Sequence, residues 1–236
     1  MSVSRFKGGL TNTKKTDDTG NLGVPDPTRW HQYMNDFDEY DLADWVITTT
    51  EAGTGSATEA VGSEDGGVLV LTNAADEDDC DFLQFKGGTN AAVRETFKFE
   101  SGKKLFFKSR FKVNDADQVD IVMGLQITDT TPLAVTDGVY FQSSDEAGTL
   151  SLNVTKDSST SSGTVATLAD DTYVQVGFYY NGKDEVQGFL NDAKITTLAT
   201  TNLPDDEELT ISFGVQNGED VAQSMSIDYI FVAKER

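Results

Sequence analysis

The acidic run DEDDCD at residues 76–81 is the densest cluster of possible metal ligands in the chain. Calcium prefers several carboxylate and carbonyl oxygens that converge on one point. The spacing does not fit an EF-hand loop, because the glycine at the sixth position and the glutamate at the twelfth are both missing. The run is therefore either a calcium site or, as the spacing favours, a solvated acidic loop. The candidate calcium ligands are Asp76, Asp78, Asp79 and Asp81.

Residues for nucleophilic or zinc chemistry are scarce. His31 is the only histidine and Cys80 the only cysteine, so neither a zinc site with the usual ligands nor an intrachain disulfide is available. No G-x-S-x-G motif is present. Glycoside hydrolysis needs two carboxylates on one strand face within a cleft, whereas Asp120 and Asp228 are expected on outward faces or at turns. We predict that the protein is not an enzyme and uses no cofactor.

Aromatic side chains are the other candidates for a binding site, because they can stack on sugars. The candidates lie in two expected strands, and they are Tyr140, Phe141, Phe178, Tyr179 and Tyr180. At alternating strand positions an aromatic side chain usually belongs to the core. We predict core positions for Phe178 and Tyr180, and we retain Tyr179 as a candidate for stacking on a glycan.

Two long strands joined by a polar turn, at residues 104–128, are the central elements expected to position such groups. In the first strand, apolar residues alternate with polar and basic ones, so that Leu105 and Phe107 share one side. After the turn, residues 119–127 repeat the alternation and can cover the same core. The opposite side of the first strand, or its edge, carries a basic stripe, defined as Lys104, Lys108, Arg110 and Lys112.

The basic stripe has two interpretations. Its charges either offset acidic residues of neighbouring strands, or they meet an acidic surface of another protein. On the second interpretation Lys108 and Arg110 are partner-binding residues.

Strand-like segments arrive about every ten residues from residue 82 onward, separated by Asn-Gly and Asp-Gly turns. Residues 93–100 are predicted to form one of these strands, and the Ser/Thr-rich residues 157–164 a loop. Helix signals are nearly absent, with residues 204–209 as the candidate for a single turn. The pattern predicts an all-β protein with one antiparallel β-sandwich domain at residues 31–236.

Residues 1–30 show neither the alternation of a strand nor the periodicity of a helix, and they are predicted to form an extended N-terminal arm. The arm carries five basic and three acidic residues, a net charge of +2, whereas the rest of the chain carries −24. Such a segment either folds back on its own sandwich or gains order on a partner surface. The candidate partner-binding residues of the arm are Arg5, Phe6, Lys7, Lys14, Lys15 and Trp30.

The formal net charge of −22 bears on partners and location. Nucleic acids and anionic membranes attract Lys and Arg, so we predict that neither is a partner. The N-terminus MSVSRFKGG has no apolar core of signal-peptide length, and no run of 18 apolar residues occurs. We expect synthesis in the cytoplasm without a visible export signal.

The strand order resembles the concanavalin A-like lectin and glucanase jelly roll over roughly residues 35–234. The segments that carry the resemblance are FKSRFKV, VMGLQIT, GVYFQ, LSLNV, YVQVGFYYNG, VQGFLN and SIDYIFV. The resemblance implies a jelly-roll β-sandwich. The Glu-x-Asp-x-x-Glu signature of the laminarinase-type enzymes is absent, and lectin metal ligands cannot be matched, so neither activity is carried over.

A narrower resemblance, to jelly-roll virion proteins of tailed phages from marine and cyanobacterial hosts, rests on phrases such as WVITTTEAGTGSATEAVG, GGVLVLTNAADEDD and LQITDTTPLAVTDGVYF. It implies a structural protein that decorates or cements the capsid exterior. The implied partners are the major capsid protein or other virion proteins, with a homo-oligomer or several copies on the shell. The alternative is a lectin-like virion adhesin that binds host surface glycans.

Overall fold

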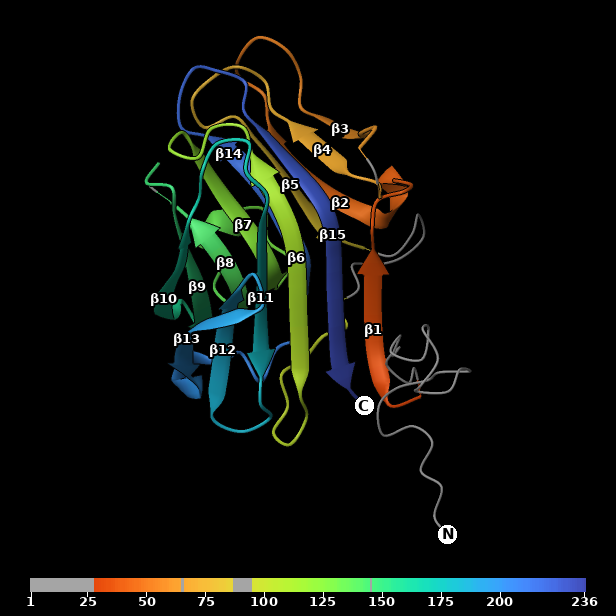
Figure 1. Cartoon of the computed structure of the whole chain (residues 1–236), viewed down its shortest axis with the longest axis vertical. Helices are drawn as coiled ribbons and strands as arrows, with labels where there is room; N and C mark the ends of the chain where they lie inside the picture. The colour runs from red at the N-terminus through yellow and green to blue at the C-terminus, as the bar shows by residue number, and fades with distance from the viewer. Residues whose placement is uncertain (1–27, 65, 87–94, 145) are drawn as a thin grey trace.

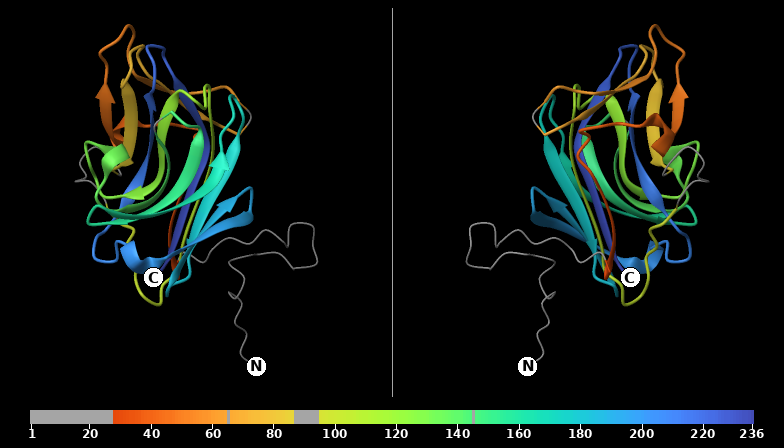
Figure 2. Two further views of the ribbon diagram at one scale, coloured as in Figure 1. Left: turned by 90° about the vertical axis from the view of Figure 1, so that its left-hand side faces the viewer. Right: turned by 90° about the vertical axis from the view of Figure 1, so that its right-hand side faces the viewer.

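The computed structural model describes residues 28–64, 66–86, 95–144 and 146–236. These residues form two antiparallel β-sheets packed face to face (Figures 1 and 2). The described part of the chain contains no α-helix, and its short 3₁₀ segments are η1 (Leu42–Asp44), η2 (Pro132–Ala134) and η3 (Thr200–Asn202). The predicted all-β sandwich is confirmed. The predicted arm lies outside the described residues except for its last three.

The front sheet, which faces the viewer in Figure 1, has eight strands. Its order is β13-β12-β11-β6-β15-β4-β3, and β1 pairs with the edge of β15 that faces away from β6. The bounds are β1 (Trp30–Asn35), β3 (Thr58–Val61), β4 (Leu69–Thr72), β6 (Leu105–Val113), β11 (Val174–Tyr180), β12 (Glu185–Leu190), β13 (Ala193–Ala199) and β15 (Ser224–Glu235).

The back sheet has seven strands in the order β10-β9-β8-β7-β14-β5-β2. The bounds are β2 (Trp45–Thr50), β5 (Cys80–Phe85), β7 (Val119–Gln126), β8 (Gly138–Ser143), β9 (Thr149–Lys156), β10 (Ser159–Thr167) and β14 (Thr210–Asn217).

The two central strands predicted from the sequence lie in different sheets. The alternate residues of β6 from Leu105 to Val113 are buried, and those between them are half-buried or exposed. β7 belongs to the back sheet and adds its own buried residues to the same hydrophobic core, as predicted. Phe107 and Phe178 stack within this core, with ring centroids 5.1 Å apart and planes 8° apart.

Three local predictions were wrong or incomplete. Residues 159–164 belong to strand β10, because Asp157 and Ser158 both take positive φ, at 49° and 64°, and so form the tight turn that pairs β10 with β9. The expected strand at 93–100 is reduced in its described part to one isolated bridge, between Phe97 and Leu209. Residues 204–209 contain no helical turn, and the nearest one is η3.

Candidate functional site

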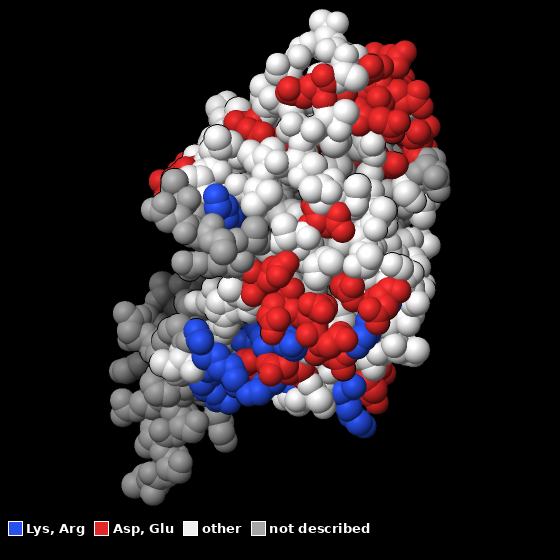
Figure 3. Space-filling model, turned by 180° about the vertical axis from the view of Figure 1, so that it is seen from behind, with Lys and Arg blue, Asp and Glu red and all other residues white. Residues whose placement is uncertain are grey.

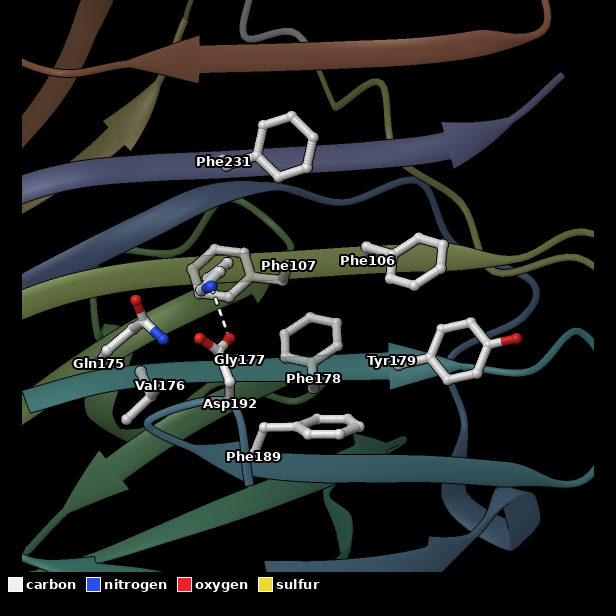
Figure 4. A pocket seen from close by; sticks show the side chains of 11 residues that line it. Phe106, Phe107, Gln175, Val176, Gly177, Phe178, Tyr179, Phe189, Asp192 and Phe231 are labelled. Atoms are coloured by element: carbon white, nitrogen blue, oxygen red, sulfur yellow. Dashed lines mark hydrogen bonds and ion pairs between the residues drawn. The ribbon is translucent and has the colours of Figure 1, made fainter. Parts of the chain in front are cut away.

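Aromatic side chains gather on the outer face of the front sheet, where they line a pocket of about 310 Å³ (Figure 4). Phe106 points outward from β6 and is 38% exposed, because its strand alternates and buries Leu105 and Phe107 instead. The other aromatic walls come from Tyr179 of β11, Phe189 of β12 and Phe231 of β15. A volume of this size is at the lower end of the range for ligand pockets.

A glycine makes the hollow between these rings. Gly177 faces outward from β11 and pairs with Lys108 on one side and Phe189 on the other. Since position 177 has no side chain, the backbone of Gly177 forms the base of the pocket, and the surrounding aromatic rings form its walls. A Cβ atom there would lie 2.9 Å from the carbonyl oxygen of Phe107, so the backbone already approaches closely.

Three rings form a row across the strands, which we call the aromatic row: Trp30, Phe106 and Tyr179. The ring centroids of Phe106 and Tyr179 are 4.5 Å apart and nearly parallel, with planes 23° apart. Trp30, the first residue of β1, continues the row with its centroid 5.7 Å from that of Phe106. Flat, partly exposed rings of this kind are suited to stacking on the apolar face of a sugar.

Polar groups close one side of the pocket. Lys108 donates to a carboxylate oxygen of Asp192 at 2.6 Å, and Tyr229 donates through its hydroxyl to Oε1 of Gln175 at 2.8 Å. The pKa of Asp192 is lowered, first by its hydrogen bond with Lys108 and then by one with Gln175. The pocket therefore combines aromatic walls with an edge of polar groups bonded to one another.

The basic stripe is largely neutralised within the chain. Besides the Lys108 pair, Arg110 binds Asp228, and Lys112 lies 3.0 Å from Glu64. Arg110 also lies over the ring of Tyr173, with 4.0 Å between the guanidinium carbon and the ring centroid. These contacts favour the interpretation in which the stripe offsets nearby acidic residues.

The four aspartates of the acidic run point to different places. Asp79 is buried and accepts the backbone N–H groups of Ala52 and Gly53 at 2.6 and 3.0 Å. Asp76 accepts the N–H of Glu77, and Asp78 accepts from Gln216. Within the described ranges, no group of three or more His, Cys, Asp or Glu side chains is placed to hold a metal ion.

Asp81 is a buried carboxyl at the interior of the sandwich. It lies on the same side of β5 as the buried Leu83, and within the described part of the chain neither of its oxygens accepts from an N–H or hydroxyl group. Its partner is the carboxyl of Glu59, with which it can share a proton. Burial, and then the charge of Glu59, raise the pKa of Asp81 to about 8. The buried hydroxyl of Tyr40 also has no partner there, and its pKa is raised by burial, Glu59 and Asp81.

The two carboxylates considered for glycoside hydrolysis, Asp120 and Asp228, do not come together. Asp120 lies in β7 of the back sheet and Asp228 in β15 of the front sheet, so they cannot act as a pair on one strand face. Among the back-sheet strands, β8, β9 and β14 contain no Asp or Glu, and Asp120 is the one acidic residue of β7. His31 contacts Thr96 at 3.1 Å, and burial lowers the pKa of its ring.

Charge on the back of the molecule is unevenly distributed. Figure 3 shows Asp and Glu in several patches on that face, with most of the Lys and Arg gathered at its lower end. Among the described residues, no helix is long and apolar enough to cross a membrane.

Sequence reasoning found part of this site. It selected Tyr179 and Trp30 separately, and the structure brings both onto the aromatic row. It missed Phe106, Phe189 and Phe231, although the alternation that put Lys108 on the outer side of β6 also put Phe106 there. Arg5, Phe6, Lys7, Lys14 and Lys15 lie outside the described residues.

No model of a protein family matches the sequence, and no curated protein sequence matches it. Solved structures do. A protein of unknown function from Shewanella oneidensis MR-1 superimposes with a TM-score of 0.61 at 17% identity, over 96% of this chain and 95% of that one. A GH16 protein of the Bacteroides ovatus mixed-linkage glucan locus, in complex with a G4G4G3G product, gives a TM-score of 0.58 at 14% identity, over 84% and 98%.

The carbohydrate recognition domain of Emp46p superimposes with a TM-score of 0.55 at 11% identity, over 84% of this chain and 94% of that one. The fold is the jelly roll of concanavalin A-like glucanases and lectins. At these identities the likeness shows the fold alone, and it confirms the predicted jelly-roll sandwich. An endo-β-1,4-glucuronan lyase from Trichoderma reesei also shares the fold, with a TM-score of 0.53, so the architecture is compatible with catalysis as well as with binding.

Proposed function

We propose that this protein is a non-catalytic carbohydrate-binding protein, and that its ligand stacks on the outer face of the front sheet. The observation that carries the proposal is the nearly parallel pair of Phe106 and Tyr179 beside the pocket. Partly exposed rings on a sheet face cost solvation free energy that a sugar face can recover. Two solved structures with this fold, a glucan complex and a carbohydrate recognition domain, support the same ligand class.

Replacing Tyr179 by alanine is expected to weaken glycan binding about tenfold or more. Stacking of a flat ring on an aromatic side chain is worth roughly 1–3 kcal/mol in the well-studied case of nucleobases, and tenfold in affinity corresponds to about 1.4 kcal/mol. A glycan array followed by calorimetry on the best ligand measures the change.

Leu42→Ala is the matched control, because Leu42 is 58% exposed in η1 and does not line the pocket. It should bind as the unaltered protein does. A blank array across neutral and acidic host polysaccharides would contradict the proposal.

The setting that we propose for this protein is the exterior of a tailed-phage head, where it binds the major capsid protein or another virion protein in several copies. This rests on the phage-like phrases of the sequence and on the position of β1 (Figure 1). In the described sheet β1 pairs with β15 alone, directly after residues 1–27. Met34 of this strand is 55% exposed. A cementing role without glycan binding is the second candidate function.

Deletion of residues 1–27 is expected to leave the sandwich folded and to reduce co-sedimentation with intact capsids severalfold. The deletion stops at residue 27 because Trp30 belongs to β1 and packs on Phe106. Thermal unfolding checks the fold, and quantitative gel analysis of pelleted capsids measures occupancy. Unchanged occupancy would show that the arm is not the anchor.

A further inference from the structure

The charges of the pocket limit the kind of glycan that it can take. Lys108 and Asp192 are the charged residues among those that line it, and they are bonded to each other at 2.6 Å (Figure 4). Gln175 binds Asp192 as well, and Tyr229 holds the other end of the Gln175 amide. A uronic acid or sulfated sugar would have to separate Lys108 from Asp192 to obtain a cation.

The net charge of the whole protein also disfavours acidic glycans. A formal net charge of −22 repels a polyanionic polysaccharide at long range, particularly at low ionic strength. A neutral glycan does not have to separate Lys108 from Asp192, and the net charge of the protein does not repel it. It needs apolar faces for the rings, and hydroxyl groups that can join the bonded polar edge.

The aromatic row sets the length and direction of the ligand. Its rings stand on β1, β6 and β11, and β15 lies between β1 and β6. The centroid distances of 5.7 Å between Trp30 and Phe106 and 4.5 Å between Phe106 and Tyr179 give the row a length of at most about 10 Å, which is longer than a single sugar ring. The pocket lies at the Tyr179 end, beside Phe189.

We infer that the ligand is a neutral, unbranched oligosaccharide that lies across the strands. One sugar occupies the pocket beside Tyr179, and the chain continues over Phe106 to Trp30. This inference rests on the proposed function and names its ligand class.

Calorimetry with matched series of oligosaccharides tests the inference. Neutral gluco-, manno- and xylo-oligosaccharides of one to six sugars are compared with oligogalacturonides of the same lengths. We expect the affinity for one neutral series to rise at least tenfold from one sugar to about three and then to level off. Oligogalacturonides should bind at least tenfold more weakly at each length.

Variants at the two ends of the aromatic row separate its parts. Trp30→Ala should remove the gain between one and three sugars while leaving the affinity for the shortest ligands unchanged, and Trp30→Phe should restore much of the gain. Tyr179→Ala should weaken binding at every length, and Leu42→Ala at none. Thermal unfolding of each variant verifies that the sandwich is intact.

The inference fails while the proposed function stands if acidic chains bind more tightly than neutral ones. It fails in the same way if affinity does not depend on length, or if Trp30→Ala leaves the length dependence intact. Absence of binding to every series would overturn the proposed function and the inference together.

Discussion

Replacing Asp81 by asparagine is expected to raise the free energy of unfolding at pH 9 by about 3–5 kcal/mol and to change it little at pH 4. The carboxyl is fully buried, and in the described part of the chain neither oxygen accepts from an N–H or hydroxyl group. Its pKa is raised from the ordinary value of 3.8 to about 8 in the folded protein, first by burial and then by Glu59. One unit of pKa corresponds to about 1.4 kcal/mol. The expected effect is set somewhat below this figure multiplied by the whole pKa shift, because the folded protein can relax around the charged carboxylate.

The direction follows from proton linkage. Between roughly pH 4, near the pKa of an unfolded aspartate, and about pH 8, the folded protein holds a proton on Asp81 that the unfolded chain has released. The stabilising contribution of this proton is complete below about pH 4, declines as the pH rises and is gone above about pH 8. The unaltered protein should therefore lose stability across this window relative to Asp81→Asn.

Chemical denaturation at each pH from 4 to 9 measures the difference between the two proteins, in which the titration of other carboxylates largely cancels. Glu59→Gln provides a second test. The charge of Glu59 contributes to the raised pKa of Asp81, so removing it should lower that pKa. The pH-dependent loss should then end at a lower pH and be smaller in total than in the unaltered protein. Parallel stability curves for the unaltered protein and Asp81→Asn would contradict the raised pKa.

Two adjacent aromatic residues of β11 should give opposite results. Phe178→Ala is expected to lower the free energy of unfolding by about 3–5 kcal/mol, the usual cost of removing a buried ring. Phe178 is 1% exposed and lies against Phe107, Phe99 and Phe141. Tyr179→Ala, on the outer face, should cost about 1 kcal/mol or less.

Urea unfolding of the two variants, with equal slopes, measures this contrast. Tyr179→Ala should then lose glycan affinity without losing stability, which separates a binding residue from a core residue one position away. Equal stability losses would place Tyr179 in the core and remove the basis for the site.

The alternation along β6 and β11 was sufficient to predict which residues are buried, because a period of two on a half-buried strand leaves little ambiguity. It correctly placed Phe178 and Tyr180 in the core. The Ser/Thr-rich strand β10 was missed because polar composition was given more weight than the Asp157-Ser158 turn, whose positive φ angles specify a hairpin.

The pocket could be predicted only in part, because it depends on which strands become neighbours. Phe106, Phe189 and Phe231 are far apart in sequence, and they meet through the pairings of β6 with β15 and β11, and of β11 with β12. The same holds for the partners of the basic stripe. Lys112 binds Glu64, which lies 48 positions away and carries no local sequence signal for the contact.

The position of Trp30 connects the proposed anchor, the N-terminal arm, with the proposed glycan site. It is the last residue of the predicted N-terminal arm and the first of β1, and its ring extends the aromatic row from a strand held by pairing with β15. Linkage is reciprocal, so a contact that holds β1 in place and raises glycan affinity by some factor is itself strengthened by the glycan by the same factor. On this basis, a protein anchored through its arm would bind its glycan with higher affinity than the same protein free in solution.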